Sequence, residues 1–72
     1  MNRAERTELL VKAIEKAVVA VDATAQVTKV GLSGCTVLTE NTEAVAEVIR
    51  TAFCESVYVE DFPNANALAC FF

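Results

Sequence analysis

The spacing of apolar residues changes from helical to strand-like within residues 41–62. Between Val45 and Phe53 the apolar side chains recur at intervals of three and four, and most charged residues lie outside this stripe, which predicts an amphipathic helix. From Val57 onward apolar and polar residues alternate, as they do in a strand with one covered face. We therefore expect a helix that begins near Asn41 and a strand that follows it directly.

An earlier helix is expected from the first residues of the chain to about Asp22. Asn2 is followed three residues later by Glu5, which resembles a capping box, and Glu8 and Lys12 are spaced as a favourable ion pair. The apolar stripe of this helix is expected to comprise Leu9, Leu10, Ala13, Ile14, Ala17, Val18 and Val21.

Residues 27–39 predict a β-hairpin. Ser33-Gly34 can form a two-residue turn in which Gly34 takes a positive φ. That turn would place four apolar residues on the helix-facing side and bring Val30 opposite Ile49 of the second helix. The four expected residues are Val30, Leu32, Cys35 and Val37.

A last strand is expected at residues 67–72, after a turn at 63–66. The element order α-β-β-α-β-β predicts an α+β fold, a two-layer sandwich in which both helices cover one face of a four-stranded, mainly antiparallel sheet. A right-handed crossover through the second helix would give the strand order 2-1-3-4. Residues 1–72 are expected to form one domain.

The chain is apolar for its size, with 54% hydrophobic residues and a mean hydropathy of +0.40. Its apolar runs fall far short of the roughly twenty residues of a membrane span, and its charged start is unlike a secretory signal. We therefore expect a cytoplasmic protein without membrane contact. A domain this small has a thin margin of stability, so the apolar excess favours a homodimer, formed through the open sheet face or the edge of strand 67–72.

Charge is unevenly distributed along the chain. Residues 1–39 carry five cationic and four acidic side chains, whereas residues 40–72 carry six acidic side chains and Arg50 alone as a cation. This acidic half argues against direct nucleic-acid binding, which requires a basic surface. It is compatible with a protein partner that has a basic surface.

The sequence offers little for catalysis or metal binding. It contains no histidine, and its three cysteines lack a CxxC pair, so neither a zinc site nor a disulfide framework is indicated. Each cysteine is expected to be a small buried hydrophobe. Glu60 and Asp61 are neighbours that would point to opposite faces of a strand, so they imply no carboxylate pair. We therefore expect no enzyme activity and no cofactor.

The uncovered face of the sheet is the strongest functional signal. It is expected to present Lys29, Thr36, Leu38, Tyr58, Glu60, Phe62 and one terminal phenylalanine. One interpretation is that Phe62 and Phe72 return to the core or lie under a second chain. The other is a recognition surface with aromatic anchors inside an acidic rim. Its partner-binding residues would be Glu43, Glu47, Tyr58, Glu60, Asp61 and Phe62.

These patterns favour a small acidic protein-interaction module. It would act as an adaptor, or as a phage-type inhibitor, by docking on a basic site of a larger protein that handles nucleic acid. The alternative is a homodimeric regulatory domain that binds a small ligand between a helix and the sheet.

Overall fold

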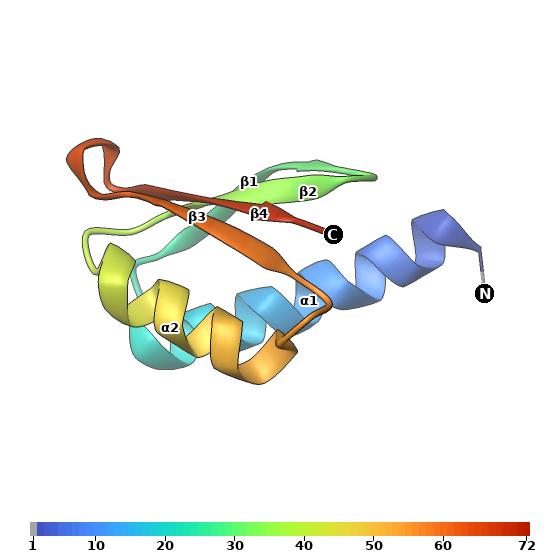
Figure 1. Cartoon of the computed structure of the whole chain (residues 1–72), viewed down its shortest axis with the longest axis horizontal. Helices are drawn as coiled ribbons and strands as arrows, with labels where there is room; N and C mark the ends of the chain where they lie inside the picture. Colours follow the sequence, from blue (N-terminus) through green and yellow to red (C-terminus); the bar gives the residue numbers. More distant parts are fainter. Residues whose placement is uncertain (1) are drawn as a thin grey trace.

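The computed structural model describes residues 2–72 and shows two helices packed on one face of a four-stranded antiparallel sheet (Figure 1). A short 3-10 turn, Pro63–Ala65, separates the last two strands. The elements are α1 (Arg3–Val21), β1 (Gln26–Gly31), β2 (Gly34–Leu38), α2 (Thr42–Phe53), β3 (Tyr58–Phe62) and β4 (Ala67–Phe71). This confirms the expected α-β-β-α-β-β order and the two-layer α+β architecture.

The strand order is β1-β2-β4-β3, so the expected order 2-1-3-4 was wrong. β3 and β4 form a hairpin, and β4 then pairs antiparallel with β2, which leaves β3 at an edge. The composition of the two strands explains this choice. β4 is apolar on both faces and gains most from an interior position, whereas Glu60 and Asp61 suit β3 to an edge. An edge contact through residues 67–72 is thereby ruled out.

The register of the first hairpin also differs from the expected one. The turn residues are Leu32 and Ser33, and a bulge between Thr28 and Gly31 gives Lys29 a φ of +51°. The bulge turns the Val30 side chain away from the core. Because Val30 is 55% exposed, it cannot face Ile49 as predicted.

Gly34 is required for a different reason than expected. Its φ is not positive; instead, a Cβ at this position would collide with the carbonyl group of Cys70 on β4. A side chain would therefore push the two central strands apart. A Cβ on Gly31, by contrast, would meet open space apart from a distant backbone oxygen.

The core lies between the inner face of the sheet and the two helices. The sheet contributes cross-strand rows such as Val37 beside Leu68 and Cys35 beside Cys70. Fully buried core side chains are Ile14, Val18, Val37, Val45, Ala46, Ile49 and Leu68. Burying these side chains supplies most of the favourable free energy of folding.

The buried face of α1 is rotated relative to the predicted stripe. Thr7, Val11, Ile14 and Val18 are buried, while Leu9, Ala13 and Val21 are exposed. The rotation follows from where the hairpin lies, because Thr7 Oγ1 donates a hydrogen bond of 3.3 Å to the carbonyl oxygen of Leu32. The apolar pattern therefore missed Thr7, a polar residue, as part of the packed face of α1.

The start of α1 matches the prediction. Asn2 occupies the N-cap position, and its Oδ1 accepts a 2.8 Å hydrogen bond from the backbone N–H of Glu5. The Glu8 carboxylate and the Lys12 ammonium form the expected ion pair at 3.4 Å, on the solvent side of the helix. Such exposed pairs contribute little, about 0.3–0.5 kcal/mol.

Candidate interaction surface

The open face is the side of the sheet that points away from both helices (Figure 1). Strand register arranges its residues in three rows that cross the sheet in the order β1, β2, β4, β3. These rows are Gln26-Leu38-Ala67-Phe62, Thr28-Thr36-Ala69-Glu60 and Gly31-Gly34-Phe71-Tyr58. The rows contain five of the residues that the sequence predicted for this face, with Phe71 as the terminal phenylalanine, whereas Lys29 lies in the bulge outside the rows. The five are Thr36, Leu38, Tyr58, Glu60 and Phe62.

Three aromatic side chains give this face its apolar character. Tyr58, Phe62 and Phe71 are 63%, 47% and 46% exposed, and Leu38 is also exposed. The rings of Tyr58 and Phe71 lie side by side, with centroids 6.1 Å apart. Phe62 stands at the other end of β3, in the row of Leu38 and Ala67. Exposed aromatic side chains that share one face are typical of interaction surfaces.

The open face also contains a shallow hollow of about 310 Å³. The small or short residues Gly34, Thr36 and Ala69 line it, together with Lys29 and Phe71. Large and small residues thus stand at opposite ends of the two central strands, with Leu38 and Gly34 on β2 and Phe71 and Ala67 on β4.

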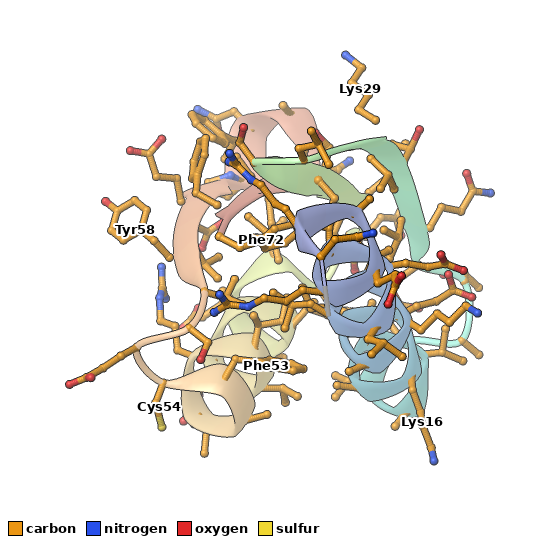
Figure 2. All side chains as sticks on the ribbon, turned by 90° about the vertical axis from the view of Figure 1, so that its right-hand side faces the viewer. Lys16, Lys29, Phe53, Cys54, Tyr58 and Phe72 are labelled. Atoms are coloured by element: carbon orange, nitrogen blue, oxygen red, sulfur yellow. The ribbon has the colours of Figure 1, made fainter. Side chains whose placement is uncertain are left out.

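Charge on this face is confined to its two edges. Lys29 lies at the β1 edge, and Figure 2 shows its side chain pointing away from the helices. Glu60 lies at the β3 edge, in the same row as Thr28. These are the two charged residues of the open face within residues 2–72.

The six predicted partner-binding residues fall on three surfaces. Tyr58, Glu60 and Phe62 lie together on the open face. Glu43 and Glu47 lie on α2, where they line a shallow hollow together with Glu40. The sixth residue, Asp61, points to the inner side of β3, in register with buried Leu68.

Both edges of the sheet carry features that discourage pairing with another strand. At the β1 edge, the bulge at Lys29 interrupts the regular ladder. At the β3 edge, Arg50 Nη2 donates a 3.0 Å hydrogen bond to the carbonyl oxygen of Val59. Asp61 also turns a charge inward there, and its buried Oδ1 has no hydrogen-bond partner within residues 2–72. Bulges and inward-pointing charges are common protection for edge strands.

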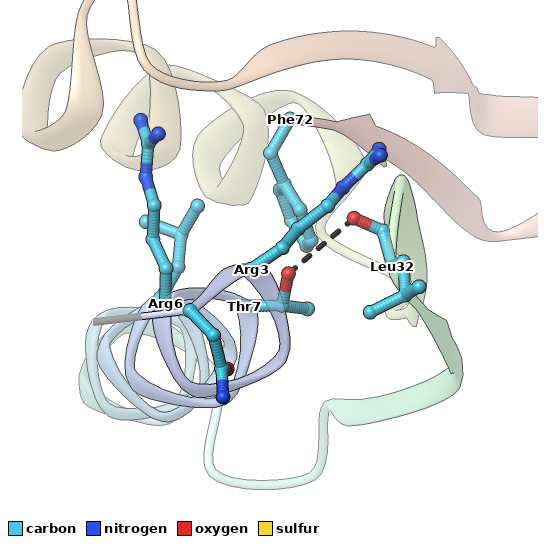
Figure 3. Close-up of a pocket in the computed structure, with 7 residues that line it drawn as sticks. Arg3, Arg6, Thr7, Leu32 and Phe72 are labelled. Carbon is cyan, nitrogen blue, oxygen red and sulfur yellow. Dashed lines mark hydrogen bonds between the residues drawn. The ribbon is translucent and has the colours of Figure 1, made fainter.

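A second hollow lies between the start of α1 and the end of the sheet (Figure 3). It measures about 470 Å³, and Arg3, Arg6, Thr7, Leu32 and Phe72 line most of it. Phe72 packs partly against the core, as one interpretation of the sequence expected for it, whereas Phe62 remains on the open face. Two guanidinium groups beside an aromatic ring would suit an anionic ligand.

The cysteines occupy two kinds of environment. Cys35 and Cys70 are buried cross-strand neighbours, and the hydrogen bond with Cys35, together with burial, raises the pKa of the Cys70 thiol. Cys54 is exposed at the C-cap of α2, so the prediction that all three are buried was wrong for this residue. Within residues 2–72 no three metal-ligating side chains converge, and neither helix is long and apolar enough to cross a membrane.

The Asp22 carboxylate accepts several hydrogen bonds from residues of the fold. The Thr39 hydroxyl donates to Asp22 Oδ2 at 2.6 Å, and the hydroxyl and backbone N–H of Thr24 donate to Oδ1. These hydrogen bonds, that of Thr39 first, lower the pKa of Asp22 to about 2. Thr39 Oγ1 also accepts from the backbone N–H of Asn41, so the network joins the end of α1 to the start of α2. Because its partners all belong to the fold, we assign Asp22 a structural role.

Comparison with known proteins adds no further assignment. No protein-family model matches the chain, and neither a curated protein nor a solved structure matches it significantly. The function is therefore argued from the surface itself.

Proposed function

We propose that this chain is a small acidic protein-interaction module that docks through its open face. In this proposal it acts as an adaptor or inhibitor on a basic site of a larger protein, one that handles nucleic acid. The observation that carries the proposal is the exposure of three aromatic side chains on one face, the adjacent Tyr58 and Phe71 and, at the other end of β3, Phe62. Aromatic residues are enriched in protein interfaces.

The charge of the adjoining side supports a basic partner. α2, which carries Glu43 and Glu47, packs against β3, the strand that carries Tyr58 and Phe62 (Figure 1). Arg50, the cation of residues 40–72, is engaged with the carbonyl oxygen of Val59. The carboxylates of α2 would attract a basic surface over a distance and raise the association rate.

The experiment is affinity capture from a lysate of the native cell with four immobilised variants. We expect wild type and Leu9→Ala to retain the same protein, and Tyr58→Ala and Phe71→Ala to lose most of it, because anchor truncation speeds dissociation. Leu9 is the matched control, an exposed apolar residue on α1, away from the sheet. Retention by all four variants alike, or by none, would contradict the proposal.

The role of the acids is measured on the captured protein once it is identified. Glu43→Lys combined with Glu47→Lys should slow association and reduce its salt dependence, with little change in the dissociation rate. Unchanged association kinetics would show that these acids serve solubility only.

A second candidate function is favoured by the hollow beside Arg3 and Arg6, which lies between a helix and the sheet. A regulatory domain could bind a small carboxylate or phosphate there, within the usual size range of ligand sites. Thermal melts with a panel of such anions would test it. Stabilisation that is present in wild type and in Lys16→Gln but absent in Arg6→Gln would favour this function over the first.

A further inference from the structure

The open face has the shape that a second copy of the same face would fit. A two-fold axis lying in the contact plane and parallel to the strands reverses the strand order of the second copy. β2 then lies over β4 of the second copy, and β1 over its β3. Each row of register partners therefore lies over the same row of the second copy, with the order of its four residues reversed.

Large residues meet small ones along the centre of this arrangement. Phe71 lies over Gly34 of the second copy, Leu38 lies over Ala67, and Thr36 lies over Ala69. Gly34 lines the hollow that also contacts Lys29 and Phe71, so the Phe71 ring of the second copy lies over this hollow. Alternation of large and small residues between facing layers is how packed sheets reach high density.

In the outer strands, Gly31 lies over Tyr58 of the second copy, Thr28 over Glu60 and Gln26 over Phe62. The Lys29 side chain, which follows Thr28 in β1, stands over the β3 edge, where Glu60 lies. The two-fold axis forms this Lys29–Glu60 pair twice. Each open face thus supplies one cation and one anion, and each charge meets its opposite.

A two-fold axis across the strands is unfavourable. It would place Glu60 over Glu60 of the second copy and Lys29 near Lys29, so that like charges meet at both edges. Like charges placed together at an interface cost affinity. Charge therefore selects the axis parallel to the strands.

We propose that a second copy of this chain covers the open face, sheet on sheet, about a two-fold axis parallel to the strands. The bulge in β1 and the Arg50–Val59 hydrogen bond at β3 protect both sheet edges against pairing with another strand. Self-association is therefore expected through the face of the sheet. Four strands of five to six residues cover about 19 by 17 Å. That footprint, roughly 320 Å² on each chain, is below the roughly 800 Å² per partner of a standard interface, so we predict a weak dimer with a dissociation constant in the micromolar range.

The dimer goes beyond the proposed function and does not rest on it. It is formed by the purified chain alone, whereas the proposed function concerns a different protein. Because both would occupy the open face, a larger partner and a second copy would exclude each other.

The test is sedimentation velocity of purified variants across a concentration series. Wild type should change from monomer to dimer over the micromolar range. Lys29→Glu and Glu60→Lys should each weaken dimerisation at least about tenfold, because each substitution creates two like-charge contacts. The double variant Lys29→Glu with Glu60→Lys should recover most of the lost affinity. Lys16→Glu and Glu43→Lys, on the helices, are controls that should behave as wild type.

Ala69→Arg provides an independent variant, since it places a charged side chain at the centre of the interface and should give a monomer. Its urea midpoint identifies any loss of folding. A wild-type chain that stays monomeric at millimolar concentration would overturn the proposal. A dimer that Ala69→Arg leaves intact, or that the double charge variant fails to restore, would overturn the geometry.

Discussion

At the scale of single residues, Asp22 shows how a position that looks unfavourable in sequence becomes important in the fold. A carboxylate at the C-terminal end of a helix is disfavoured by the helix dipole. Asp22 nevertheless occupies the C-cap of α1, where hydrogen bonds from Thr39 and Thr24 stabilise its charge. The sequence indicated only the end of a helix at this point, because Thr39 lies seventeen residues away.

This network predicts a specific dependence of stability on pH. Because the folded-state pKa of Asp22 is about 2 and the ordinary value is 3.8, its ionised form stabilises the fold above about pH 4. That contribution is lost as the pH falls from about 4 through 2. Asp22→Asn should lower the urea midpoint at pH 6, and the difference from wild type should shrink by pH 2. A difference that stays constant over this range would contradict the role given to the charge.

At the scale of elements, the first hairpin marks the limit of prediction from local pattern. The Leu-Ser-Gly sequence allows a turn at either Leu32-Ser33 or Ser33-Gly34, and a shift by one residue exchanges the faces of a strand. The structure adopts the first option and restores the alternation with a bulge at Lys29. What selects it is the approach of β4 to Gly34, a contact between residues far apart in sequence.

A pair of matched substitutions tests this register. Val37→Ala removes two methyl groups from a fully buried side chain and should cost about 2 kcal/mol of unfolding free energy. Val30→Ala, in the neighbouring strand, should change it by less than about 0.5 kcal/mol because Val30 is exposed. Urea unfolding of the two variants measures both values. Equal midpoints would mean that Val30 belongs to the core after all.

The order of the elements was predictable, but their arrangement was less so. Apolar period identifies both helices, and alternation identifies the open-face residues Leu38, Tyr58 and Phe62 correctly. Strand order depends on which strands gain most from two neighbours. The two apolar faces of β4 contained that information, since an edge position would have left them exposed.

At the scale of the whole molecule, the uneven charge of the sequence becomes an uneven surface. α2 and β3 lie together on one side and contribute acidic residues, while α1 contributes most of the cations (Figure 1). The sequence predicted that Glu43, Glu47 and Asp61 form one site with Tyr58 and Phe62. In the structure, Glu43 and Glu47 lie on α2, and Asp61 points to the inner side of β3, away from the open face. Residues adjacent in sequence on a strand point to opposite sides, which is why Glu60 and Asp61 diverge.

Small size and an exposed apolar face together predict that stability depends on protein concentration. If folding is coupled to dimerisation, each tenfold rise in concentration above the dissociation constant adds about 0.7 kcal/mol per chain by mass action. For a domain of this length that corresponds to a rise of about 3–6 °C in melting temperature. We expect calorimetry of wild type to show this rise, and Ala69→Arg, which blocks the face, to melt at a constant temperature. Lys16→Glu, a remote charge reversal on α1, should follow wild type. A wild-type melting temperature that does not change with concentration would mean that the chain folds as a monomer with its aromatic face in water.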